Sequence, residues 1–144
     1  MTLRCKSDGQ IVDHRFDLPY LVHTNFELGL MLDGKKPLAV FNDWSDHIHP
    51  VLARYLRMFD RHVAAGTFVK RKETRAPQSN DDPGSWIVLY AQKNEGWRIE
   101  KMIELMRAMH EGRWTREDER LEGVLLGYED WQNEIWLSRG PHGL

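Results

Sequence analysis

The segment TFVKRKETRAPQSNDDPGSWIVLYA, residues 67–91, decides the fold class of this protein. Residues 67–74 are typical of a basic, amphipathic strand, and residues 86–91 contain consecutive large apolar side chains, as in a buried strand. The intervening residues 75–85 combine prolines, a glycine and short polar side chains, which indicates an exposed loop. Two successive strands with no helix between them can pair as an antiparallel hairpin. This arrangement predicts an α+β fold rather than a regularly alternating sheet.

Strands and helices are also expected before this hairpin. Residues 10–16 and 36–41 are predicted as strands, and residues 24–32 as a short helix. The clearest helix is expected at 50–63, because its apolar residues recur at helical spacing and its arginines fall on the other side. A proline opens this helix and a glycine follows it, as is common at the two ends of a helix.

Helices are expected throughout the chain after the hairpin. Apolar residues at helical spacing predict one helix before Gly112, and a second helical region begins after Thr115. Gly127 leaves two possibilities open, a single helix or two helices separated at this glycine. We therefore predict one α+β domain over residues 1–138, with about four strands in a small mixed or antiparallel sheet packed against four or five helices. Residues 139–144 are expected to form a loose tail.

The composition of the chain narrows the classes of function. It has 144 residues, of which 41% are hydrophobic, and its 20 basic and 22 acidic residues nearly balance. A dedicated nucleic-acid-binding domain usually carries a clear basic excess. With a single cysteine, Cys5, the chain forms no internal disulfide, and zinc sites that need several cysteines are excluded. No signal peptide, membrane-spanning run, phosphate-binding loop or dinucleotide motif is visible, so a cytoplasmic protein without a cofactor is expected.

Glu27 has two interpretations. The spacing Thr24-Asn25-Phe26-Glu27 is that of a capping box, in which Thr24 and Glu27 bond each other's backbone amides. The run HTNFELGLML (residues 23–32), followed by GKKPLAV (residues 34–40), also resembles the glutamate-bearing helix and Lys-Pro strand of nucleoside 2-deoxyribosyltransferases. The resemblance implies that Glu27 attacks a sugar carbon as a nucleophile. That family places a strand, a helix and a second strand before this motif, whereas 23 residues precede Thr24 here.

A second candidate site lies where the chain approaches the helix at 50–63. Asp43, Asp46, His47 and His49 are suitable ligands for a divalent metal, and His47 and His49 are also candidate catalytic residues together with Glu27. Polar residues in this position also serve as helix caps. No established metal-binding spacing is present, so capping is the preferred interpretation and no metal is predicted.

A third candidate is the basic strand. Lys70, Arg71, Lys72 and Arg75 could contact phosphate groups of a nucleic acid without reading its sequence. Charged side chains also protect the edge strand of a sheet from pairing with other proteins. Because aromatic residues for base stacking are scarce here, a solvated edge is the preferred interpretation.

The aromatic residues near the C-terminus suggest a protein interface. Tyr128, Trp131, Ile135 and Trp136 lie within nine residues of one another and point in several directions on a helix, so a small domain has difficulty burying all of them. We therefore predict a binding or accessory protein that forms a homodimer or contacts another protein through these residues. An enzyme acting on a small molecule, with the Glu27 motif or the histidine cluster as its site, and a nucleic-acid-binding protein remain the alternatives.

Overall fold

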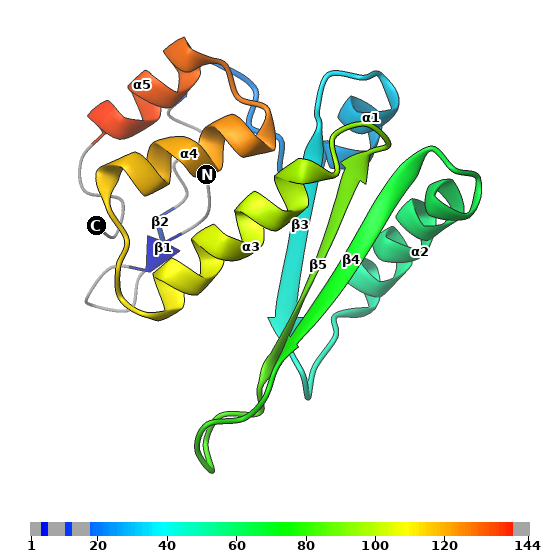
Figure 1. The fold of residues 1–144 in the computed structure, drawn as a ribbon, viewed down its shortest axis with the longest axis vertical. Helices are drawn as coiled ribbons and strands as arrows, with labels where there is room; N and C mark the ends of the chain where they lie inside the picture. Colours follow the sequence, from blue (N-terminus) through cyan, green and yellow to red (C-terminus); the bar gives the residue numbers. More distant parts are fainter. Residues whose placement is uncertain (1–3, 6–10, 13–17, 140–144) are drawn as a thin grey trace.

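The hairpin predicted in residues 67–91 forms two of the three strands of the main sheet, and its loop projects away from the rest of the structure (Figure 1). The computed structural model describes residues 4–5, 11–12 and 18–139. β4 (Phe68–Arg75) and β5 (Ser85–Gln92) pair antiparallel, with Phe68 opposite Gln92 and Arg75 opposite Ser85. β3 (Leu38–Trp44) pairs antiparallel with the other side of β5, which gives the order β3-β5-β4. The α+β fold is confirmed, with a three-stranded antiparallel sheet and five helices.

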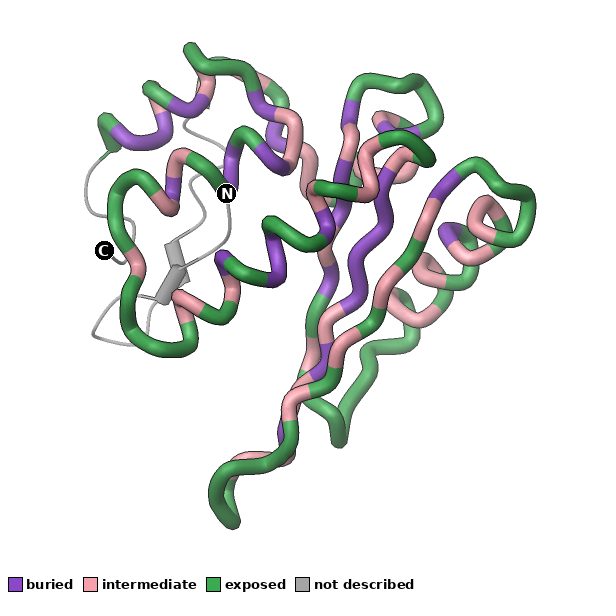
Figure 2. Tube along the Cα trace, viewed as in Figure 1, coloured by how far each residue is buried: buried purple, intermediate pink, exposed green. Residues whose placement is uncertain are grey.

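The central position of β5 explains its run of apolar residues. Successive side chains of a strand point to opposite faces of the sheet, and both faces of this sheet are covered. Val88 and Tyr90 pack with Phe59 of α2 (Pro50–Ala64) on one face. Leu89 packs with Ile103 of α3 (Trp97–His110) on the other. β5 is the most continuously buried strand of the sheet (Figure 2).

The remaining helices extend these two layers. α1 (Glu27–Leu32) contributes Met31 to the layer of α2, and α4 (Arg116–Leu126) contributes Leu125 to the layer of α3. α5 (Asp130–Ser138) packs against α4 at the far side from the sheet (Figure 1). Trp136 and Tyr128 form a separate small cluster there.

The predicted starts of α2 and α4 agree closely with the structure. Pro50 is the first residue of α2, and the ring of His49 accepts a hydrogen bond from the Val51 amide at 3.2 Å, which confirms the capping interpretation. Thr115 and Asp118 form a capping box at α4. Gly127 has a φ of 95°, a left-handed conformation that ends α4 and separates it from α5. The open choice between one and two C-terminal helices is therefore decided in favour of two.

The two ends of the chain are described only in part. The strand predicted at residues 10–16 is seen as β2 (Ile11–Val12), which pairs antiparallel with β1 (Arg4–Cys5) and not with the main sheet. The other residues of this predicted strand, and 140–144 of the predicted tail, lie outside the described residues. Among the described helices, none has the length and apolar character needed to cross a membrane.

Candidate functional site

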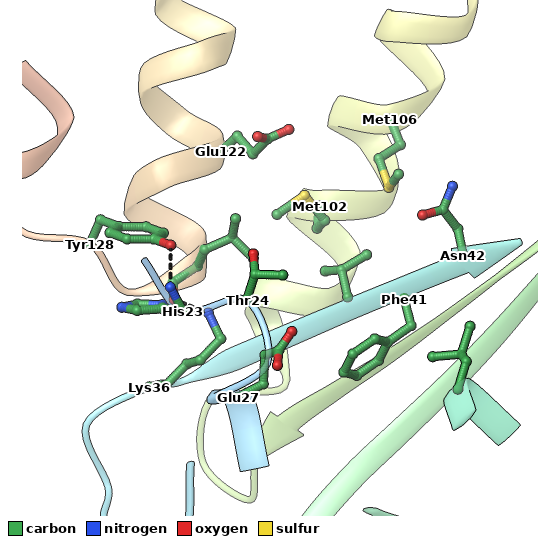
Figure 3. Close-up of a pocket in the computed structure, with 13 residues that line it drawn as sticks. His23, Thr24, Glu27, Lys36, Phe41, Asn42, Met102, Met106, Glu122 and Tyr128 are labelled. Carbon is green, nitrogen blue, oxygen red and sulfur yellow. Dashed lines mark hydrogen bonds between the residues drawn. The ribbon is translucent and has the colours of Figure 1, made fainter. Parts of the chain in front are cut away.

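A cavity of about 290 Å³ lies beside the outer edge of β3, where the two helical layers meet (Figure 3). Apolar side chains of β3, α2, α3 and α4 form much of its wall, with Met102 and Met106 on the α3 side. The polar groups are gathered at the end near the start of α1 and the end of α4. We call this cavity the Lys36 pocket, and its main polar residues are His23, Thr24, Glu27, Lys36, Glu122 and Tyr128.

Lys36 is the most unusual residue of this pocket, because its side chain is only 2% exposed. Its Nζ atom lies 2.8 Å from Nδ1 of His23 and 2.7 Å from the carbonyl oxygen of Leu126 at the end of α4. Burial lowers the pKa of Lys36 from 10.5 to about 7, and the nearby carboxylate of Glu27 opposes this lowering. Near neutral pH, the free amine of Lys36 is therefore much more populated than that of an ordinary lysine.

His23 and Tyr128 hold one side of this amine. Their rings stack at a centroid distance of 3.9 Å, and the backbone amide of His23 donates to the Tyr128 hydroxyl at 2.8 Å (Figure 3). Burial, with the charge of Lys36 as a second cause, lowers the pKa of His23 to about 3. His23 is therefore neutral at pH 7, and its Nδ1 atom can accept a hydrogen bond from Lys36. The hydroxyl of Tyr128 keeps a proton that it can donate.

Glu27 borders the same pocket, and its capping-box interpretation is wrong. α1 begins at Glu27 itself with Phe26 as the preceding residue, and no side chain caps its first turn. A capping box needs its glutamate two residues further into the helix. Instead, Tyr55 of α2 donates a hydrogen bond to Oε1 of Glu27 at 3.2 Å, and the Leu28 amide donates to Tyr55 at 2.9 Å. The carboxylate of Glu27 points toward the interior of the pocket (Figure 3).

Together these groups provide the parts of an acid–base site. Lys36 can hold or release a proton near neutral pH, and Glu27 supplies a carboxylate at the same cavity. The apolar wall reduces the access of water, which strengthens electrostatic interactions inside the pocket. The carboxylate of Glu27 borders the cavity and disfavours a negatively charged ligand.

The predicted histidine and aspartate cluster does not converge. Asp46, His47 and His49 are exposed, and His49 caps α2. Within residues 4–5, 11–12 and 18–139, no group of three or more histidine, cysteine, aspartate or glutamate side chains is placed to hold a metal ion. Asp43 bonds the amide of Trp44 at 2.9 Å. The structure therefore brings Glu27 to a pocket but leaves His47 and His49 outside it.

The basic residues of β4 are paired within the chain. Lys70 bonds Asp60 at 2.8 Å, and Arg71 contacts Glu73 and Glu100. Arg75 binds Asp82 through two hydrogen bonds, of 2.6 and 3.0 Å, at the base of the projecting loop. The Lys72 amine lies 5.7 Å from the centre of the Trp86 ring. These acidic and aromatic partners compete with phosphate for the same cations, which favours the solvated-edge interpretation.

Two of the four predicted interface residues are packed inside the chain. Tyr128 is 6% exposed and Trp136 is 3% exposed. The indoles of Trp136 and Trp114 both donate to the buried carboxylate of Glu119, at 2.8 and 2.6 Å. Trp131 is 49% exposed, although its ring forms a T-shaped contact with the ring of Tyr20. Ile135 is half-buried.

Sequence reasoning did not identify Lys36 or His23 as candidate residues. One signal was available for Lys36, since the strand predicted at residues 36–41 would place it on the same face as Leu38, which is buried. A lysine aligned with a buried face is rarely left without partners. No comparable pattern marks His23, whose partners Lys36 and Tyr128 are 13 and 105 residues away along the chain.

Comparison with known proteins gives no match to a family model, to a curated protein or to a solved structure. The resemblance of residues 23–40 to nucleoside 2-deoxyribosyltransferases therefore stays a prediction. The geometry of the Lys36 pocket is the basis for the function proposed below.

Proposed function

We propose that the protein is a small-molecule enzyme whose site is the Lys36 pocket, and that Lys36 and Glu27 exchange protons with a small, uncharged or cationic ligand. The observation that carries this proposal is the buried amine of Lys36 at the wall of a cavity that also holds the carboxylate of Glu27. An ionisable group with a strongly shifted pKa in a cavity is a frequent feature of catalytic sites. The cavity volume of about 290 Å³ suits a small molecule.

Several contacts support a binding role for this pocket. Glu27 is positioned by Tyr55 from a different helix, so its carboxylate is oriented before a ligand arrives. His23 and Tyr128 are fixed by stacking and by a backbone hydrogen bond. The hydroxyl of Thr24 adds a further donor or acceptor at the same end of the cavity. Such pre-oriented polar groups in a mostly apolar wall are typical of ligand sites.

The proposal is tested by thermal unfolding in the presence of small polyols, hydroxyaldehydes, hydroxyketones and amines. A ligand at about 100 times its dissociation constant stabilises the folded state by about 2.7 kcal/mol, which raises Tm by several degrees. The variant Glu27→Gln should lose most of this shift. Glu104→Gln, a change at an exposed residue of α3 that does not line the pocket, should keep it. If none of these compounds raises Tm of the unmodified protein, the proposal is wrong.

Association through α5 is a second proposal, favoured by the exposure of Trp131. A tryptophan that is 49% exposed can become an anchor in a protein interface. Replacing Trp131 by Ala should convert a dimer to a monomer in native mass spectrometry, while the fold is retained. A monomeric unmodified protein at micromolar concentration would contradict this proposal. The expected cytoplasmic location also stays a prediction.

A further inference from the structure

The position of Lys36 also indicates which ligand chemistry the pocket can use. We infer that the Lys36 amine forms a covalent imine with the carbonyl carbon of a small, uncharged hydroxyaldehyde or hydroxyketone. This inference rests on the proposed function of the same pocket and goes beyond it by naming the reacting atom and the substrate class.

The contacts of Lys36 are the first argument. Its Nζ atom directly contacts a neutral imidazole nitrogen and a backbone carbonyl oxygen, and no carboxylate bonds to it among the described residues. A lysine that is ion-paired keeps its proton, whereas a desolvated lysine without a bonded carboxylate can present a free amine. The lowered pKa of about 7 agrees with this geometry. The free amine is the form that attacks a carbonyl group.

The surroundings of the amine provide the proton transfers. When the lone pair of Nζ attacks the carbonyl carbon, the carbon–oxygen double bond becomes a single bond, and Glu27 carries one proton from the nitrogen to the oxygen, which becomes a hydroxyl group. The carbon–nitrogen double bond then forms as the hydroxyl group leaves, and Glu27 carries the second proton of the nitrogen to this group, which departs as water. One amine and one carbonyl compound thus give one imine and one water, and Glu27 regains its starting state. No electron donor or acceptor is needed.

The charge of the pocket narrows the substrate class. The carboxylate of Glu27 opposes the entry of a keto acid or a phosphorylated sugar. The polar end of the cavity, with Thr24 and Tyr128, can bind hydroxyl groups next to the carbonyl. An uncharged molecule with a carbonyl and an adjacent hydroxyl satisfies both conditions.

The experiment is reductive trapping with glycolaldehyde and cyanoborohydride at pH 7, followed by peptide mass spectrometry. Imine formation leaves a hydroxyethyl group on the reacting lysine. Lys35 is the internal control, because it is exposed and adjacent in sequence. At pH 7 the free-amine fraction of a lysine of pKa 7 exceeds that of an ordinary lysine by about a thousandfold. An amine of lower pKa is also a weaker nucleophile, which offsets part of this advantage. Lys36 should therefore be labelled at least about tenfold faster than Lys35.

Two further measurements make the result specific. In urea the difference between Lys36 and Lys35 should disappear, because it depends on the folded pocket. Glu27→Gln should slow the labelling of Lys36 several-fold and leave Lys35 unchanged, while Glu104→Gln should change neither. Equal labelling of the two lysines in the folded protein would overturn the inference. If polyols raise Tm but Lys36 is not trapped, only the imine is refuted; if no compound binds and no label appears, the proposed function fails as well.

Discussion

The stability of the fold should depend on pH through Lys36. Its pKa is lowered from 10.5 to about 7 in the folded state, so between these values the unfolded chain binds more protons than the folded protein. The free energy of unfolding must therefore rise with pH across this window. Below pH 7, Lys36 is charged in the folded state, and the full cost of burying this charge lowers the free energy of unfolding. At about 1.4 kcal/mol per pKa unit, the shift of 3.5 units corresponds to roughly 5 kcal/mol in total.

The useful range for the experiment is pH 7.5 to 9.5. Burial raises the pKa of Tyr20 and Tyr55 to about 12, so above pH 10 the unfolded chain loses tyrosine protons first and stability falls again. Within the range, Lys36 should contribute a gain of about 2–3 kcal/mol. With a denaturant slope of about 2 kcal/mol per molar urea, the unfolding midpoint should rise by about 1 M.

The assay is urea unfolding followed by tryptophan fluorescence at several pH values, for the unmodified protein and for Lys36→Met. Methionine is similar in length to lysine but does not titrate, so the variant should show a much flatter curve. Lys35→Met, at the exposed neighbour, should keep the original slope. Subtracting the curves removes the contributions of all other groups. If Lys36→Met and the unmodified protein have the same pH dependence, the amine is not buried as described, and the argument for the pocket fails.

Three further outcomes follow from the packing. Gly127→Ala should lower the free energy of unfolding by more than about 2 kcal/mol, because φ is 95° and a Cβ atom would lie 2.4 Å from the ring of Pro37. Gly112→Ala, where φ is 73° and no atom lies within 4 Å of the added Cβ, should lower it by about 1–2 kcal/mol in the same urea assay. Trp136→Ala should lower stability by about 3–5 kcal/mol, measured by thermal unfolding, since its ring is buried in the chain itself. The Gly84 amide donates a hydrogen bond to Asp82 at 2.8 Å, so Asp82→Ala should accelerate hydrogen exchange at this amide without a matching change in the central sheet.

The main elements were predictable because their signals are local. The apolar run of β5, the spacing in α2 and the Thr115–Asp118 capping box each lie within a short stretch of sequence. The break at Gly127 was recognised as possible but not decided, since a glycine in a helical region is compatible with either outcome. The structure decides it through the left-handed backbone at this residue.

The site was predicted much less well. The Glu27 motif pointed to a residue that does border the pocket, but its spacing was assigned to a capping box that the start of α1 rules out. Tyr128 was predicted at an interface, and its stacking on His23, 105 residues earlier in the chain, was not foreseen. Lys36 reaches the carbonyl of Leu126, 90 residues later. Such contacts depend on how the helical layers meet, which no local pattern encodes.

The buried lysine needs an explanation beyond helix capping. The carbonyls of Gly123 and Val124 accept from the amides of Tyr128 and Gly127, as expected for a left-handed helix end. Arg98 also donates to the Val124 and Leu125 carbonyls, which leaves the Leu126 carbonyl for Lys36.

A single neutral donor would satisfy the Leu126 carbonyl without the cost of a buried amine. A buried charge is usually more costly than an apolar or neutral group of similar size. The lowered pKa of Lys36 corresponds to a cost of roughly 5 kcal/mol for the charged amine at acidic pH. A buried amine with this desolvation cost, at the wall of a cavity and next to a positioned carboxylate, supports the proposal that the amine takes part in chemistry.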